Sequence, residues 1–422
     1  MSDSRFPIRH KLTARAAALK EAIVACFTLD PELARVRLTG FAESDWLNVL
    51  WWLDTSGMAL YFHHRAHEIG ADAALPRAIE SALAQRLSSN RIRMRSLFYE
   101  SRALAAWFEG GNIPYALLKG VTLTPHSVPD SSLRSQADLD FLVADRFADL
   151  AVHYIHRLGY RLHARGRNTL EFRAGASHPP NILDIYSAKT RRALELHLAA
   201  DASCEMQLLS RRQIREFDGA SIYALSPADI LIEQARHLLK HLCGEHTRVS
   251  WIFEFWRHVR NRRNERDFWR TAESCAADLT HGDLAMGVAA WLAENFFGGT
   301  QAEIPLQWRT DALPGRVRLW LERYARSLLL SDTIGNKLYA LLRKELPGGT
   351  GGQRTTCQIL LPRVAPAPIL HAPPNESWLQ KRTRYRVEAH FIIRRLWFHL
   401  REGIRFAIEA SRWNRAVARA ER

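Results

Sequence analysis

The sequence has 422 residues, of which 47% are hydrophobic and 24% are charged. This composition supplies a large buried core and excludes a chain that is disordered by default, and the length predicts two or three domains. The net charge of +15 attracts polyanions but does not by itself indicate a nucleic-acid-binding protein, because much of the basic excess lies in residues 379–422.

The sequence contains no run of about eighteen apolar residues that would cross a membrane. Its basic N-terminal stretch lacks the apolar segment of a secretion signal. The five cysteines form no CxxC pair and are scattered at Cys26, Cys204, Cys243, Cys275 and Cys357. An odd, unpatterned set favours reduced thiols, so we expect a cytoplasmic protein.

The first part of the chain, residues 1–110, is predicted to be an N-terminal helical region. Apolar residues recur there at three- and four-residue spacing from about residue 10. Two glycines and Asn112 are expected to end the last of these helices. Histidines 63, 64 and 67 are predicted to be surface residues of a helix.

The hydrophobic period then changes to that of strands, which predicts an α/β core over residues 111–215. A strand at 113–118 precedes Lys119 and Gly120, a short helix and loop follow, and Leu139, Phe141, Leu142 and Val143 mark a second strand. A helix should end at Gly159. Further strands are expected at 160–164, 168–174, 181–186 and 193–199. The predicted fold class is α+β, with a small mixed β-sheet core embedded in a largely helical protein.

Beyond the core, residues 216–345 are predicted to form a C-terminal helical domain, in which Ser226 caps the first helix and Pro227 occupies its first turn. A Pro/Gly-rich linker at 346–377 and a basic amphipathic helix at 378–422 follow. The apolar stripe of that helix is Phe391, Ile392, Leu396, Trp397 and Leu400. The helix could lie on nucleic acid or an anionic membrane, or dock its stripe onto the protein and leave its arginines in solvent.

Two acids, Asp138 and Asp140, stand on the second predicted strand. Side chains two apart on a strand share a face, so the two carboxylates repel each other unless a cation lies between them. A hard cation such as Mg²⁺, or Mn²⁺, suits such a pair and takes its remaining ligands from phosphate and water. An isolated Asp-x-Asp is usually a solvated loop, but burying this pair among apolar residues is costly without a partner.

Basic and flexible residues accompany the pair. Gly120 allows backbone amides to approach a phosphate, Lys119 supplies a point charge, and Arg134 can bind a phosphate oxygen with its planar guanidinium. The order of strand, Lys-Gly, loop, Arg and acid pair predicts a nucleotide site.

With these residues in place, the segment resembles a bacterial nucleotidyltransferase family of unassigned substrate within the polymerase-β-like superfamily. That family is marked by LKG and then R-x-x-x-D-[LI]-D-x-L-V, which match Leu118–Gly120 and Arg134–Val143. Gly159-Tyr160, Glu195-Leu196-His197 and Trp251–Glu254 extend the resemblance over roughly residues 95–260. The usual Gly-Ser pair of the superfamily is Lys-Gly here, a variant that the family shares. The chain departs from the family pattern with Leu198 in place of Trp and Glu254 in place of Asp, and these changes are mild for metal binding.

The resemblance implies an enzyme that moves a nucleoside monophosphate from a nucleoside triphosphate, such as ATP, to an acceptor hydroxyl or other nucleophile. A third carboxylate is then expected as base or metal ligand. Glu195, flanked by leucines, is preferred for that role over Asp184. The acceptor, whether a small molecule, sugar, peptide or protein, is not readable. Two alternatives stay open: an inactive nucleotide- or partner-binding protein on the same fold, and an RNA-binding protein that uses the basic tail.

Three histidines, His237, His241 and His246, stand close together on or after a later helix. The i,i+4 spacing of the first two can bind zinc, but no HExxH motif or suitable Cys accompanies them. Packing or phosphate contact is the preferred interpretation.

Overall fold

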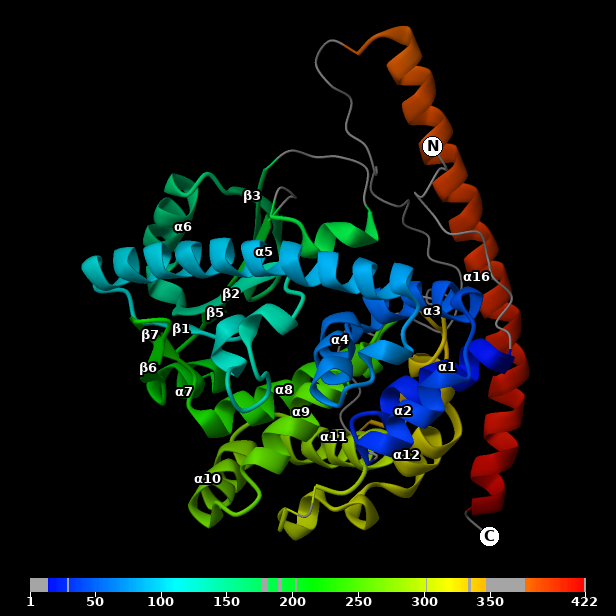
Figure 1. Ribbon diagram of the computed structural model, residues 1–422. Coiled ribbons are helices and arrows are strands. Elements are labelled where there is room, and N and C mark those ends of the chain that lie inside the picture. The colour runs from blue at the N-terminus through cyan, green and yellow to red at the C-terminus, as the bar shows by residue number, and fades with distance from the viewer. Residues whose placement is uncertain are drawn as a thin grey trace. The chain divides into compact units, whose positions relative to one another are not determined.

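The computed structural model describes residues 14–28, 30–175, 181–188, 192–201, 203–300, 302–332, 335–346 and 376–420. The chain forms two compact units (Figure 1). Unit 1 comprises residues 1–176, 182–239 and 248–312, and unit 2 comprises residues 177–181, 240–247 and 313–422. The two units are treated separately below.

Unit 1 begins with helices, as the apolar spacing predicts: α1 (Ala14–Ala25), α2 (Pro31–Thr39), α3 (Glu43–Ser56), α4 (Ala59–Glu68) and the long α5 (Arg77–Gly110). The Asp30 carboxylate caps α2 by accepting from the Glu32 backbone N–H at 2.9 Å. Gly57 ends α3 with a φ of 74°, a left-handed conformation that glycine adopts without steric cost. The predicted helix end near Gly110 is confirmed.

A seven-stranded mixed sheet follows, with strand order β3-β4-β5-β2-β1-β7-β6. β2 pairs with β5 and β1 with β7 in parallel, and the other neighbours are antiparallel. This sheet within a largely helical chain confirms the predicted α+β class. The strands are β1 (Tyr115–Leu117), β2 (Asp138–Ala144), β3 (Arg161–Arg165), β4 (Thr169–Ala174), β5 (Arg192–Ala199), β6 (Gln213–Phe217) and β7 (Ala220–Ala224).

One face of this sheet is apolar and packs on helices α5 and α6 (Ala148–Arg157), which lie beside it in Figure 1. Phe141 of β2 is fully buried there and meets the ring of Phe108 from α5 edge-on, with 5.6 Å between ring centroids. Since successive side chains of a strand alternate between faces, Asp138 and Asp140 project from the opposite face.

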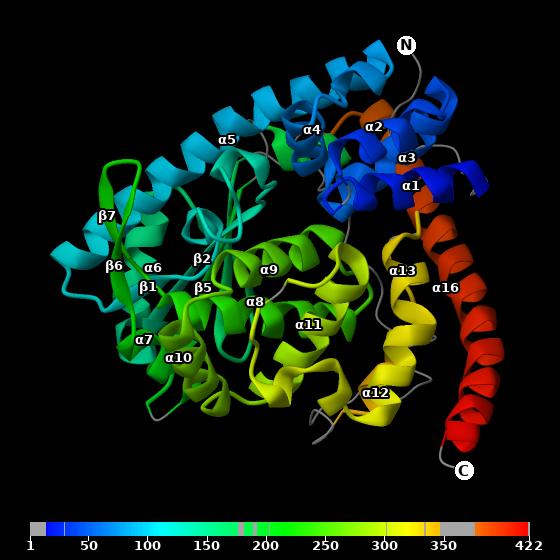
Figure 2. The same cartoon turned by 60° about the horizontal axis from the view of Figure 1, so that its bottom comes forward.

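Two features of the sheet differ from the predictions. Residues 181–186 were expected to be a strand but form a 3₁₀ helix (Ile182–Tyr186), in which the buried Tyr186 hydroxyl donates to Asp54 at 2.9 Å. The β6–β7 hairpin was not predicted at all and extends the sheet beyond residue 215. Its turn is Asp218-Gly219, with positive φ at both residues, and the hairpin stands at the edge of the sheet in Figure 2.

Helices close unit 1. The Ser226 hydroxyl accepts from the Asp229 N–H at 3.1 Å, so the predicted cap of α8 (Pro227–Leu242) is confirmed. α9 and α11 pack side by side (Figure 2). The remaining helices are α7 (Cys204–Ser210), α9 (Val249–Asn261), α10 (Arg266–Ala277) and α11 (Gly282–Phe297).

Unit 2 contains α12 (Gly315–Trp320), a π-helical turn (Leu321–Ala325), α13 (Arg326–Leu329), α14 (Tyr339–Lys344) and the long helix α16 (Trp378–Ala420). The predicted linker lies largely outside the described residues, and the five-part division of the chain stays a prediction. Of the described cysteines, all four are free thiols, while Cys357 lies outside the described ranges. No helix in the described parts of the chain is long and apolar enough to span a bilayer.

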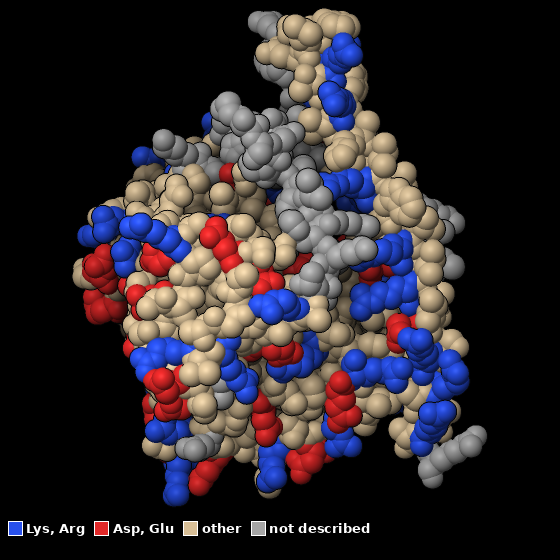
Figure 3. Space-filling model, turned by 45° about the vertical axis from the view of Figure 1, so that its right-hand side comes forward, with Lys and Arg blue, Asp and Glu red and all other residues tan. Residues whose placement is uncertain are grey.

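The basic helix α16 forms as predicted, but its apolar stripe faces solvent. Leu396, Trp397 and Leu400 are more than half exposed, whereas the buried positions include Phe406 and Trp413. Trp413 packs on Tyr324 of the π-helical turn, with 6.2 Å between ring centroids. Lys and Arg side chains occur along the length of α16 (Figure 3). Docking of the stripe onto the protein, onto a nucleic acid or onto a membrane stays a prediction.

Candidate functional site

The acids predicted from the sequence meet on the polar face of the sheet. Asp140 of β2 is 1% exposed, and Asp138 is half-buried. The parallel register places Asp140 directly opposite Glu195 of β5, so their side chains share one face. Asp184 lies instead on the 3₁₀ helix. The structure thus brings Asp138, Asp140 and Glu195 together.

Two basic side chains hold Asp140. The Lys119 Nζ donates to Asp140 Oδ1 at 2.9 Å, and His197 Nε2 lies 3.4 Å from the same oxygen. His197 also lies 3.5 Å from a Glu195 oxygen. Burial alone would lower the pKa of His197, but its hydrogen bonds to Asp140 and Glu195 raise the pKa to about 9. The imidazole is therefore a cation within the acidic cluster.

Gly120 is required by its surroundings. Its φ is +73°, and a Cβ added there would lie 2.5 Å from the Gln136 amide oxygen. The left-handed backbone strains any larger residue, and its Cβ would displace the end of the Gln136 side chain. The turn after Lys119 is thereby fixed, which directs the lysine onto Asp140.

The second acid, Asp138, is electrostatically unsatisfied. Burial, together with the charges of Asp140 and Glu195, raises its pKa to about 6, although Lys119 and Arg134 oppose the rise. The other oxygen of Asp140, Oδ2, is buried without a hydrogen-bond partner. A buried carboxylate oxygen without a partner is costly. A hard divalent cation binds such oxygens, so this donor set fits Mg²⁺ or Mn²⁺.

Arg134 does not extend freely into the site. Its Nε lies 3.2 and 3.3 Å from the two carboxylate oxygens of Glu254 on α9. The Tyr61 hydroxyl of α4 donates to Glu254 at 2.9 Å. Arg134 is thus fixed between three distant parts of the sequence, while its positive charge still acts on Asp138.

The family follows from a comparison of the sequence. A family model described as "Uncharacterised nucleotidyltransferase" matches residues 42–298, more than half of the chain. The chain belongs to this family. The match also extends well beyond the predicted 95–260 and includes helices α3 and α4 with Tyr61.

None of the curated proteins matches this nucleotidyltransferase-family chain in sequence. Among solved structures, a similar one is the crystal structure of an antigenic nucleotidyltransferase-like protein from Paracoccidioides brasiliensis. It shows 14% identity and a TM-score of 0.29, and the match covers 49% of this chain and 97% of that one.

In this nucleotidyltransferase-family chain, the structure adds residues that the sequence did not single out. Besides His197 and Tyr61, these are Arg93, which is buried, and Arg248, which is half-buried; burial lowers the pKa of both guanidinium groups, and the charge of Asp138 partly opposes this. The Arg93 Nε donates to the Gln136 carbonyl at 2.8 Å and anchors the segment that leads into β2. The sequence signal for His197 was present in the acid-Leu-His match, but the signal for the arginines was not.

The other histidines considered in the sequence analysis lie outside the acidic cluster on the sheet. The His237 ring packs edge-on against Trp251, with 4.5 Å between centroids, as the packing interpretation expects. In the described residues, two groups of histidine and carboxylate side chains could hold a metal ion. Neither group includes His237, His241 or His246. The surface prediction holds for His64 and His67, but His63 is only 5% exposed, so that part was wrong.

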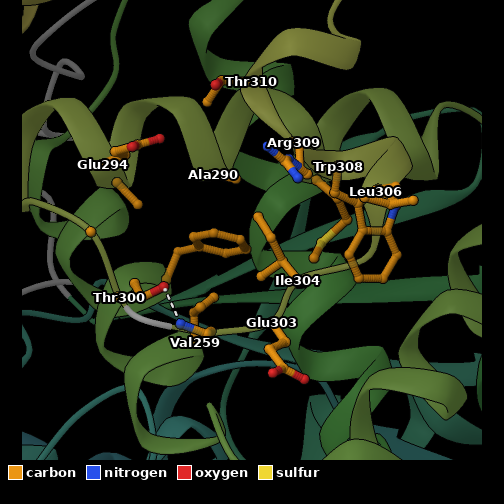
Figure 4. A pocket seen from close by; sticks show the side chains of 15 residues that line it. Val259, Ala290, Glu294, Thr300, Glu303, Ile304, Leu306, Trp308, Arg309 and Thr310 are labelled. Carbon is orange, nitrogen blue, oxygen red and sulfur yellow. Dashed lines mark hydrogen bonds between the residues drawn. The ribbon is translucent and has the colours of Figure 1, made fainter.

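Two cavities of unit 1 lie apart from the acidic cluster. A cavity of about 500 Å³ between α9 and α11 is mainly apolar, with Val259, Ile304 and Trp308 in its lining and Glu294 and Glu303 at its edge (Figure 4). The second, of about 800 Å³, is polar and contains four arginines: Arg65, Arg257, Arg260 and Arg263. Tyr61 also lines it, so this basic cavity adjoins the residue that supports Glu254 and Arg134.

Proposed function

We propose that this chain transfers a nucleoside monophosphate from a nucleoside triphosphate to an acceptor hydroxyl or other nucleophile. The observation that carries the proposal is the buried, unpartnered Oδ2 of Asp140 beside Asp138 and Glu195 on one face of the sheet. Lys119 and His197 compensate part of the negative charge of the three acids, and a divalent cation shared with a bound polyphosphate would compensate the rest.

Asp138, Asp140 and Glu195 are the residues assigned to the metal, Mg²⁺ or Mn²⁺. When bound, the ion would neutralise phosphate charge and orient the triphosphate. Lys119 compensates Asp140 before the nucleotide arrives and lies where it can also meet phosphate oxygens. Arg134, held by Glu254, contributes a second fixed positive charge.

In the proposed reaction, the acceptor oxygen attacks the α-phosphorus, and a new O–P bond forms as the bond to pyrophosphate breaks. Glu195 is assigned to take the proton from the acceptor and also to be one of the metal ligands. Glu195 stays ionised because its hydrogen bond with His197 lowers the pKa of the Glu195 carboxyl. Positioning and charge neutralisation supply most of the rate in such reactions.

The test uses purified full-length protein, Mg²⁺ and labelled triphosphates. We expect binding of a triphosphate, and pyrophosphate release when a suitable acceptor is present. Asp138→Asn should lose the binding; equal binding by this variant rejects the site assignment. Nucleotide binding without pyrophosphate release from any acceptor tested would favour the inactive, binding-only alternative.

A partner for helix α16 is a separate proposal. Its exposed Leu396, Trp397 and Ile404 lie among arginines, and this combination favours an anionic membrane surface over RNA, since RNA offers no apolar layer to cover them. Full-length protein should sediment with vesicles containing phosphatidylserine but not with pure phosphatidylcholine vesicles, and a Leu396→Ser, Trp397→Ser variant should lose this binding. Salt-dependent RNA binding that the variant retains would support the RNA alternative instead.

A further inference from the structure

A second cluster of possible metal ligands lies in the helical part of unit 1. His63 and His67 occupy i,i+4 positions on α4, and Glu80 stands in the first turn of α5. The two histidines therefore share a face of one helix, while the acid comes from the next. None of these residues belongs to the proposed nucleotide site.

The three ligand atoms form a nearly equilateral triangle. His63 Nε2 lies 3.2 Å from His67 Nε2 and 3.2 Å from Glu80 Oε1, and His67 Nε2 lies 3.3 Å from the same oxygen. Ligand atoms that surround zinc tetrahedrally, at about 2.0–2.1 Å from the ion, are about 3.3 Å apart. The triangle thus has the dimensions of one face of a zinc coordination tetrahedron.

Hydrogen bonding alone does not explain this geometry well. A proton lies along one edge of the triangle, whereas a cation at its centre reaches all three atoms at once. If both histidines donate to Glu80, their two N–H groups face each other; if one donates to the other, an edge to the carboxylate is left without a proton. Among the described residues, the ion-pair partners of Glu80 are these two histidines, so no Lys or Arg occupies the cation position.

The surroundings resemble those of bound metal ions in two respects. Asp72 Oδ2 lies 3.6 Å from His67 Nδ1, on the ring edge opposite the triangle, where a carboxylate commonly orients a metal-binding histidine. Exposure is graded, from 6% for the His63 side chain to 33% for Glu80 and 47% for His67. One side of the triangle is therefore open to solvent, where water can be the fourth ligand.

We propose that His63, His67 and Glu80 bind one divalent transition metal ion of the zinc class, which joins α4 to the start of α5. Two imidazoles and one carboxylate suit zinc or cobalt, whereas Mg²⁺ prefers oxygen ligands. Because α4 also carries Tyr61, which hydrogen-bonds Glu254, the ion would stabilise the helix that supports Arg134.

The experiment titrates chelator-treated full-length protein with Co²⁺, and then displaces the Co²⁺ with Zn²⁺. We expect one equivalent of Co²⁺ with the visible spectrum of tetrahedral coordination, and no competition from millimolar Mg²⁺. His67→Ala and Glu80→Gln should each weaken binding by more than about tenfold, since loss of even an outer-shell partner costs about 10–100-fold. Glu80→Gln preserves the side-chain shape and guards against misfolding of the other variant.

His64→Ala is the matched control, because His64 is exposed on the same helix and lies outside the triangle. Asp140→Asn is a second control that detects Co²⁺ bound at the acidic sheet cluster. Both controls should keep the tetrahedral spectrum. The proposal is overturned if the protein takes up no Co²⁺, if His67→Ala and Glu80→Gln bind Co²⁺ as the original protein does, or if Asp140→Asn abolishes the spectrum.

Discussion

Two clusters of histidine and carboxylate in unit 1 differ in the number of acids and cations that they contain. On the sheet, His197 lies between Asp140 and Glu195, and Lys119 is already bound to Asp140 at 2.9 Å. On the helices, the ion-pair partners of Glu80 among the described residues are two histidines. The sheet cluster offers mainly carboxylate oxygens, which suit a hard ion, while the helix cluster offers mainly imidazole nitrogens.

The comparison shows that ligand type alone does not define a site, since both clusters contain His and carboxylate. The number of carboxylates in each cluster and the preference of each metal for oxygen or nitrogen make the difference. The secondary structure that holds each cluster differs too. Strand register places Asp140 beside Glu195, whereas the periodicity of one helix aligns His63 with His67.

The largest effect is expected from removing the negative charge at the sheet cluster. Asp140→Asn should lower the rate of pyrophosphate release about 10³-fold, because loss of the metal removes several kcal/mol of transition-state stabilisation. Asp184→Asn is the matched control and should keep most of the activity, since Asp184 lies on the 3₁₀ helix. If the two variants lose activity equally, the assignment of the third acid is wrong.

The role of Lys119 as a fixed cation can be tested through stability. Lys119→Met should destabilise the metal-free protein by about 3 kcal/mol, because it removes the closer of the two cations beside the buried Asp140 and leaves His197 as the other. Added Mg²⁺ should then raise the melting temperature of this variant more than that of the original protein. Lys119→Arg keeps the charge and should behave close to the original. An equal response to Mg²⁺ in all three proteins would contradict this role.

A smaller effect is expected from changing the residues that hold Arg134 in place. Glu254→Gln removes the charge that fixes the guanidinium and should lower activity about tenfold through misplacement, while metal binding is retained. The kinetic measurement is kcat and KM for the triphosphate. Tyr61→Phe removes only the hydroxyl that donates to Glu254 and should have a weaker effect in the same direction. Full activity in Glu254→Gln would show that Arg134 needs no such support.

The smallest effect concerns a histidine without any carboxylate. His258 is fully buried, contacts Ser127 and Gln234, and lies near His126, Arg215 and Arg262; burial, followed by these positive charges, holds its pKa well below 6.5. The unfolded chain therefore binds a proton that the folded chain rejects. Stability should fall as the pH drops below about 6.5, by at most about 1.4 kcal/mol per pH unit for one proton.

Chemical denaturation between pH 8 and pH 5 measures this dependence. His258→Asn should be less stable at pH 8 but show a flatter profile, because it has no proton to gain. A variant profile as steep as that of the original protein would assign the pH dependence to other groups. His197 provides the contrast, since its carboxylate neighbours raise its pKa.

Local patterns were sufficient for much of the fold. The acid pair could be placed on a strand because apolar residues alternate around it, and Ser226 marked the start of α8. The β6–β7 hairpin was missed although Asp218-Gly219, between alternating residues, is a strong hairpin signal. The prediction of a strand at residues 181–186 was wrong for a different reason. A short apolar run does not distinguish a strand from other structure, and here the Tyr186–Asp54 hydrogen bond holds it outside the sheet.

Contacts between distant segments could not be predicted in this way. Glu195 was chosen because leucines flank it, but its pairing with Asp140 depends on how β2 and β5 align. Glu254 was noted only as an acid after a tryptophan, and nothing in the sequence joins it to Arg134. The burial of His63 depends likewise on the neighbours of α4, which helical periodicity around the histidine does not reveal.

The inner face of α16 bears on how truncated proteins should be interpreted. Phe406 and Trp413 are nearly fully buried, and Tyr324 donates to Glu409 of the same helix at 3.2 Å. Cutting the chain before Trp378 would therefore leave Tyr324 and its neighbours uncovered, and the shortened protein could aggregate for reasons unrelated to any ligand. Substitutions at exposed positions of α16 leave Phe406 and Trp413 in place. They are the better way to distinguish a loss of membrane binding from a loss of folding.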